Sequence, residues 1–206
     1  MSYVSSYNNR LLMKDGNLIG FEFPNPYNPL GLPPYTVRME FSDGYTPDPY
    51  GGFPGTKVQV SESPNVWDFT YENSNWHNVF HQWLSYPTPD KADILGGNIT
   101  GVTNLDYAFS DWFTKLPLMD TRYATTMNRA FASTRVTEMP NYPLDSATNL
   151  DWAFALNSNC TSGFDELYQQ ASTKAIPVTS HTKTFYQTNG TPAKTACENI
   201  PSDWKE

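Results

Sequence analysis

Charged residues, and positive ones above all, are scarce in this chain of 206 residues. Lys and Arg together number 13 against 21 Asp and Glu, which gives a formal net charge of −8. No basic stripe could displace counterions from phosphates, so nucleic acid is not an expected partner. An anionic membrane surface is disfavoured for the same reason. No stretch approaches the roughly 18 consecutive apolar residues of a membrane-spanning helix, so membrane insertion is not expected either.

Cysteine and catalytic motifs are also scarce. Cys160 and Cys197 make neither a disulfide framework nor a zinc signature, and we expect two small buried side chains. His77 and His81 lie four positions apart, but the glutamate and third ligand of a zinc hydrolase are missing. There is no phosphate loop, no Gly-x-Ser-x-Gly elbow and no calcium-loop spacing. We therefore expect no enzyme, no metal and no cofactor.

Aromatic residues (15%) and 17 prolines are abundant instead. Residues 1–33 are predicted to form an arm. Its Asp15-Gly16 turn lies between two apolar runs and predicts a β-hairpin. The proline-rich stretch 23–34 predicts an extended segment, which is either a plain linker or a strap docked on a partner. Residues 1–7 lack the charged start and apolar core of a secretory signal. We therefore expect either a fragment or a protein that reaches an extracellular setting without secretion, and the initiator Met favours the second.

Residues 34–90 are predicted to form a small antiparallel β unit. Tyr35, Val37, Met39 and Phe41 alternate with polar positions, as in a half-buried strand, and two more strands are expected near residues 58–60 and 66–71. In the segment 75–84, apolar residues recur at helical spacing. This predicts a short helix that seals the end of the following module.

One eight-residue phrase occurs three times in the second half of the chain, at 102–109, 124–131 and 147–154. Its terminal residues Phe109, Phe131 and Phe154 lie 22 and 23 residues apart. Periods in this range are typical of leucine-rich-repeat solenoids. We expect each phrase to be a short helix, with Thr103, Thr125 and Thr148 as N-caps, and an extended segment to follow at Leu116-Pro117 and Met139-Pro140.

The predicted fold class is therefore α+β. An N-terminal arm and linker (1–33) and the β unit with its sealing helix (34–90) precede a short, irregular leucine-rich-repeat module (91–206) of about three to four repeats. Residues 178–185 keep only the start and the end of the phrase, so we expect an atypical fourth repeat and a C-terminal cap.

The phrases at 102–109, 124–131 and 145–154, with the apolar-proline steps at 116–121 and 139–140, resemble the BspA-type leucine-rich repeats of bacterial surface proteins. The upstream segments 35–39, 66–73 and 94–103 resemble a module that precedes such repeats in structural proteins of gut bacteriophages. The resemblance implies a virion protein of the head fibre, capsid decoration or tail. It implies attachment to other virion proteins through the arm, a homo-oligomer, and binding to a host glycan or surface protein. A bacterial cell-surface adhesin is the alternative.

Aromatic side chains are the expected binding residues, because rings stack on sugars and dominate protein–protein contacts. For Trp112 and Phe113, core, interface and glycan-platform roles all remain open. The loop 45–55 favours an interface. The candidate binding residues are Trp112, Phe113, Tyr123, Trp152, Tyr45, Tyr50 and Phe53.

Overall fold

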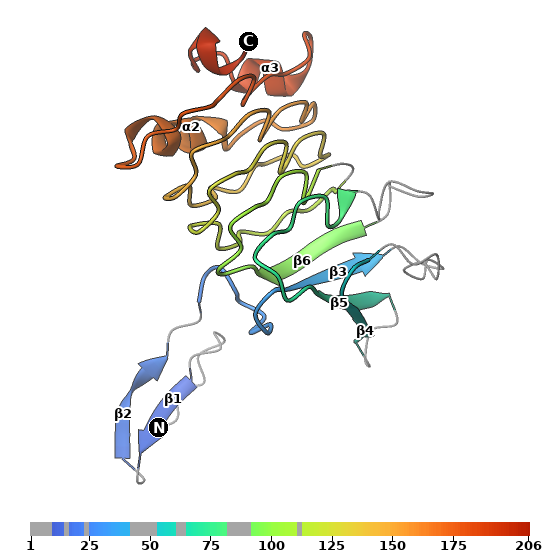
Figure 1. Ribbon diagram of the computed structural model, residues 1–206, viewed down its shortest axis with the longest axis vertical. Helices are drawn as coiled ribbons and strands as arrows, with labels where there is room; N and C mark the ends of the chain where they lie inside the picture. The colour runs from blue at the N-terminus through green and yellow to red at the C-terminus, as the bar shows by residue number, and fades with distance from the viewer. Residues whose placement is uncertain are drawn as a thin grey trace.

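The computed structural model describes residues 10–14, 17–22, 25–41, 53–60, 65–81, 92–110 and 113–206. Two sheets are present in these ranges, one of two strands and one of four in the order β4-β5-β3-β6 (Figure 1). The strands are β1 (Arg10–Lys14), β2 (Asn17–Glu22), β3 (Thr36–Phe41), β4 (Thr56–Gln59), β5 (Val66–Thr70) and β6 (Ala92–Asn98). The helices are α2 (Phe164–Thr173), α3 (Pro192–Ala196) and the 3-10 helix η2 (Ser202–Trp204).

The four-stranded sheet is antiparallel throughout and covers one end of the molecule. Val37, Met39 and Phe41 alternate along β3 on the buried side, as their period-2 spacing dictates. Opposite β3, Phe69 of β5 meets the ring of Phe80 at 6.1 Å between centroids. This face of the sheet therefore belongs to the same core as the chain that follows it.

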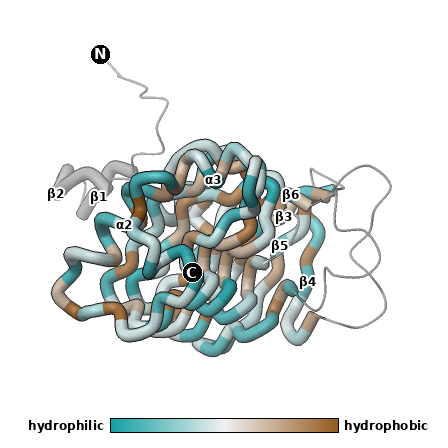
Figure 2. The backbone as a smooth tube through the Cα atoms, turned by 90° about the horizontal axis from the view of Figure 1, so that it is seen from above, coloured by the Kyte–Doolittle hydropathy of each residue, from teal (hydrophilic) through white to brown (hydrophobic). Residues whose placement is uncertain are grey.

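Between β6 and the C-terminus the chain winds into successive turns that lie one above the next (Figure 1). Parallel bridges connect Asn75, Asn104, Thr126, Asn149 and Ser180 in that order, each residue pairing with its equivalent in the next turn. Viewed from above, the turns overlie one another (Figure 2). We call this arrangement the coil stack; its five coils are 74–80, 103–109, 125–131, 148–154 and 179–185.

A column of stacked phenylalanine rings runs through the interior of the coil stack. Successive ring centroids lie 5.6, 5.5, 5.9 and 5.7 Å apart. Every ring in the column is fully buried. Offset-stacked aromatic pairs at this separation add about 0.5–1.5 kcal/mol beyond the area they bury. The phenylalanine column consists of Phe80, Phe109, Phe131, Phe154 and Phe185.

The predicted fold class is wrong. The described chain is mostly sheet, built on a four-stranded antiparallel sheet, and both of its α-helices, α2 and α3, follow the third phrase. No phrase forms a helix. The predicted alternation of helix and strand within leucine-rich repeats is replaced by turns that are connected by isolated bridges and backbone hydrogen bonds.

A left-handed residue inside each phrase explains the missing helices. The φ angles are 58° at Tyr107, 52° at Arg129 and 57° at Trp152, whereas an α-helix needs φ near −60°. Of the predicted helix over 75–84, residues 75–80 instead form a bridge and turns around Asn78, where φ is 61°, and His81 is helical. Residues 82–84 lie outside the described ranges.

The threonines predicted as N-caps therefore have another role. The Oγ1 of Thr125 donates to the carbonyl of Thr103 at 3.1 Å, and the Oγ1 of Thr148 donates to the carbonyl of Thr125 at 3.2 Å. The amide of each threonine donates to the same carbonyl. These residues connect one coil to the preceding coil instead of starting a helix.

The proline-rich segment 25–34 packs on its own chain as a strap; the prediction weighed a plain linker against a strap docked on a partner, and the choice between these two stays open. The side-chain amide of Asn98 in β6 donates to the carbonyl of Leu32 at 2.9 Å, and Leu32 is buried. Leu30 lies over Gly96, where an added Cβ would come within 2.6 Å of its Cδ1. A side chain at residue 96 would therefore require the side chain of Leu30, which is 43% exposed, to move.

Truncation of a ring in the phenylalanine column is expected to be costly. Phe131→Ala removes the ring between Phe109 and Phe154 and leaves a cavity in a closely packed interior, so we expect the free energy of unfolding to fall by about 3–5 kcal/mol. Urea unfolding followed by circular dichroism measures this change. Ile176→Ala, at a side chain that is 49% exposed, is the control and should change stability by less than about 0.5 kcal/mol. Equal losses in the two variants would contradict the column's role.

Candidate binding face

The left-handed residues of successive coils form one outer column. They occupy the same position in every coil and turn their side chains away from the core. Asn104 prepares this turn, because its Oδ1 accepts the amide of Asp106 at 2.8 Å; Asn149 does the same for Asp151 at 2.9 Å. Such Asx turns are a known way to bend the chain without a helix. The residues of the column are Asn78, Tyr107, Arg129, Trp152 and Lys183.

Aromatic rings and cations alternate along this column. The guanidinium carbon of Arg129 lies 5.6 Å from the ring centre of Tyr107 and 4.8 Å from that of Trp152. The ammonium of Lys183 lies 5.0 Å from the ring centre of Trp152 and 5.4 Å from that of Tyr186. These separations lie within the range of cation–π attraction. We call Tyr107, Arg129, Trp152, Lys183 and Tyr186 the outer ladder; all five are half-buried.

The carboxylates beside the outer ladder already accept hydrogen bonds from the next coil. Asp106 accepts hydrogen bonds from Thr126 Oγ1 at 2.6 Å and from the amide of Asn128 at 2.7 Å. Asp151 likewise accepts from Ser180 Oγ and from the amide of Thr182, both in the next coil. Each carboxylate thus connects two coils.

Arg129 and Lys183 form no ion pair within the described part of the chain. Their N–H groups remain available to a ligand, since Arg carries five donors and Lys three. The faces of the Trp152 ring, in contrast, meet the two cations. The outer ladder therefore offers cationic donors beside aromatic edges, a combination suited to acidic groups.

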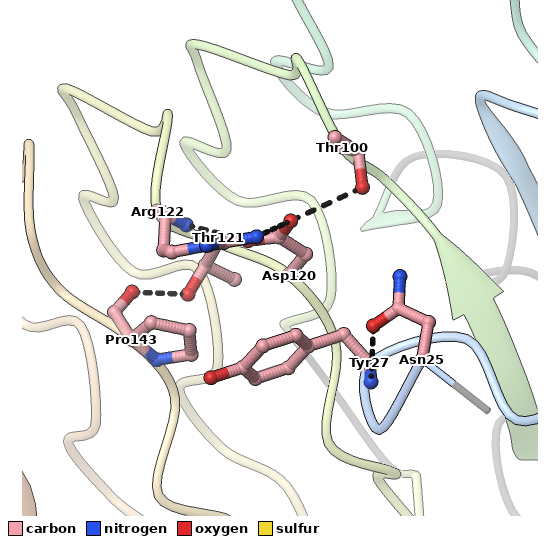
Figure 3. Close-up of polar contacts among 7 residues, drawn as sticks. All are labelled: Asn25, Tyr27, Thr100, Asp120, Thr121, Arg122 and Pro143. Carbon is pink, nitrogen blue, oxygen red and sulfur yellow. Dashed lines mark hydrogen bonds and ion pairs between the residues drawn. The ribbon is translucent and has the colours of Figure 1, made fainter. Parts of the chain in front are cut away.

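A second aromatic cluster holds the strap against the coil stack (Figure 3). Arg122 donates from Nε and from its terminal nitrogen to the two carboxylate oxygens of Asp120, both at 2.8 Å. Its guanidinium lies 5.4 Å from the ring centre of Tyr27 in the strap and 6.0 Å from that of Tyr123. Thr100 adds a hydrogen bond to Asp120 at 3.2 Å. The hydrogen bonds from Arg122 lower the pKa of Asp120, whose side chain is buried.

The structure places the predicted binding residues in different environments. Phe53 and Phe113 are buried, with Phe53 stacked on Phe80 at 5.6 Å, so neither ring faces a ligand in solvent. Tyr123 is 49% exposed beside Arg122, and Trp152 is in the outer ladder. A binding role for these two remains a prediction. Tyr45, Tyr50 and Trp112 lie outside the described residues.

The sequence analysis missed most of the outer ladder. Tyr107, Arg129 and Lys183 were not singled out, although with Trp152 they occupy the sixth position of their phrases. A position that holds only large aromatic or cationic residues in four phrases was the available signal. Tyr186 follows the fourth phrase and has no equivalent pattern.

The cysteines are free and buried, as predicted. Burial raises the pKa of both thiols, that of Cys197 to about 12, so neither is a thiolate nucleophile near neutral pH. Among the described residues, no group of three His, Cys, Asp or Glu side chains could hold a metal ion. The described helices include none with the length and apolar character needed to cross a membrane.

Comparison with known proteins returns no match to a family model, to a curated protein or to a solved structure.

Removal of the central ring of the outer ladder should weaken the coil stack. Trp152→Ala eliminates the contacts to Arg129 and Lys183 and exposes the apolar surface beneath the ring, so we expect the free energy of unfolding to fall by about 1–2 kcal/mol. Trp152→Phe keeps a ring between the two cations and should recover part of the loss. Urea unfolding of both variants measures the difference, and equal losses would show that the ring face contributes nothing.

The Asp120–Arg122 pair should make stability depend on acid pH. Because the folded-state pKa of Asp120 is lowered, its contribution is fully present above the unfolded value of about 3.9 and is lost as pH falls toward the folded value. Asp120→Asn should therefore be less stable than wild type at pH 6, with a smaller difference at pH 3. Urea midpoints at both pH values measure this gap. Asp203→Asn, at an exposed residue of η2, is the control; a gap that stays constant for Asp120→Asn would contradict the linkage.

Proposed function

We propose that this chain is a structural protein of a bacteriophage virion and that it displays the outer ladder to the host surface. The observation that carries the proposal is the continuous column of rings and cations on the outside of the coil stack. The sequence resemblance to BspA-type surface proteins and to phage structural proteins supports the same assignment. A bacterial surface adhesin is the alternative, because it needs the same kind of face.

The construction of the face supports a binding role. Each ladder residue follows a turn fixed by backbone hydrogen bonds to the neighbouring coil, such as the 2.9 Å bond from the amide of Arg129 to the carbonyl of Asp151. The side chains are therefore held before a ligand arrives, which lowers the entropic cost of binding. Acidic glycans fit this face best, because the donors of Arg129 and Lys183 have no carboxylate partner in the described chain.

The N-terminal arm, residues 1–33, supplies the attachment to other virion proteins in this proposal. The strap at 25–34 packs on the body of the protein through Leu32 and Tyr27. The hairpin β1–β2 lies beyond the strap, away from the coil stack (Figure 1). The outer ladder and the hairpin are thus separate surfaces, one for the host and one for the particle.

Location distinguishes the two assignments. Purified phage particles and envelope fractions of the bacterial cells should be analysed by mass spectrometry with antibodies against the folded chain as a second readout. A fixed copy number per particle is expected for the virion protein. Recovery in the envelope of cells that carry no phage would overturn the proposal in favour of the adhesin.

Ligand binding is tested with a glycan array that includes neutral and carboxylated sugars. We expect wild type to bind acidic glycans, and Arg129→Gln to lose at least tenfold in affinity, or about 1.4 kcal/mol. Tyr123→Ala is the matched control, because Tyr123 contacts Arg122 and lies outside the outer ladder. Loss with Tyr123→Ala alone would place binding at the Arg122 cluster, and binding to neutral sugars only would contradict the role of the cations.

A further inference from the structure

The hairpin β1–β2 is a sheet of its own. Its register pairs Arg10 with Glu22, Leu11 with Phe21 and Lys14 with Asn17. Within the described residues, neither strand pairs with any strand other than its hairpin partner. In Figure 1 the hairpin stands apart from both the four-stranded sheet and the coil stack. Both of its outer edges are therefore unpaired within the part of the chain that the structure describes.

An open two-stranded sheet of this composition needs a partner. The strand sequences are RLLMK and NLIGFE, in which apolar residues predominate. A single two-stranded hairpin is at best marginally stable in water, and each outer edge presents unpaired N–H and C=O groups that readily bind another strand. The short charged ends do not block such pairing along the middle of either strand.

The four-stranded sheet of the same chain is a poor partner for the hairpin. The β6 edge is covered, since the amide of Ile94 donates to the carbonyl of Lys115. The other edge, β4, lies three strands from β6, or about 14 Å away. Leu30 and Leu32 hold the strap beside β6, and within the described residues β4 pairs with β5 alone. Within the described residues, the four-stranded sheet therefore does not pair with the hairpin, whereas a strand of another molecule can reach either edge.

We propose that the hairpin pairs with the hairpin of a second copy of this chain, β1 of one copy lying antiparallel to β2 of the next. The charged residues at the ends of the strands favour this pairing over β1 with β1 or β2 with β2. Pairing of β1 with β1 would set Arg10 against Lys14, a like-charge contact that destabilises a sheet. Pairing of β2 with β2 would set Glu22 against the neutral Asn17. Pairing of β1 with β2 repeats the register within the hairpin and sets Arg10 against Glu22 of the second copy.

This contact is head-to-tail, and its symmetry has a consequence. Each copy uses one edge to bind the copy before it and the other edge to bind the copy after it. Such heterologous contacts close into a ring when the rotation allows it. A rotation that closes gives a ring of three or more copies joined by one sheet, and a rotation that does not close gives an open filament. In both cases the faces of the sheet can contact other proteins of a particle. The coil stacks and their outer ladders lie outside this sheet.

The test uses two single-cysteine variants of the full chain, Leu12→Cys in β1 and Gly20→Cys in β2. Residues 12 and 20 are opposite each other in the hairpin register, so they are also opposite in the proposed contact. The native thiols of Cys160 and Cys197 are buried, and wild type controls for their reaction. Equal mixing of the two variants before mild oxidation should give several-fold more disulfide-linked dimer than either variant alone.

Light scattering gives the mass of wild type and of both variants before oxidation, and an unchanged urea midpoint shows that each variant is folded. We expect a mass of three or more copies. A monomeric mass at all concentrations would overturn the proposal. Cross-linking in one variant alone, without a gain on mixing, would overturn the pairing of β1 with β2. A large mass without any cross-link would place the contact outside the hairpin.

Discussion

The backbone hydrogen bonds that connect each coil to the next are the interaction on which the rest of the structure depends. The amide of Leu105 donates to Thr126, that of Met127 to Asn149 and that of Leu150 to Ser180. Because this spacing is fixed, a side chain at one position always meets its equivalent in the next coil. The phenylalanine column inside and the outer ladder outside both follow from that single register. The side-chain carboxylates of Asp106 and Asp151 stabilise the same register, because each accepts hydrogen bonds from the next coil.

The sequence revealed the repeat but not its conformation. Leu105 and Phe109 lie four positions apart, which fits one face of a helix, and the same four positions also fit a tight coil whose two apolar residues turn inward. The difference lies at the sixth residue. A left-handed conformation at a bulky residue such as Trp152 costs about 1 kcal/mol or more, so propensity alone predicts against it. Contacts with the neighbouring coils outweigh that cost, and these contacts are tertiary.

The candidate site, too, was only partly predictable from the sequence. An aromatic-rich surface was predictable from composition, and Trp152 was singled out, yet Phe53 and Phe113 are core residues. An isolated sequence does not distinguish a buried ring from an exposed one in a loop-rich chain. Arg129 and Lys183 were overlooked because each is an ordinary surface residue when considered alone. They acquire a common role only when the coils bring them to opposite sides of the Trp152 ring.

The outer ladder also explains how an acidic protein can present a cationic face. A chain of net charge −8 would ordinarily surround each exposed cation with carboxylates. Here the acids closest to the ladder in sequence are Asp106 and Asp151. Both accept hydrogen bonds from the next coil. The attraction of the rings replaces the missing ion pairs and holds Arg129 and Lys183 in place. Stability of the coil stack and exposure of its cations are thus achieved by the same residues, so a substitution that frees Asp106 or Asp151 would weaken the stack and neutralise the face together.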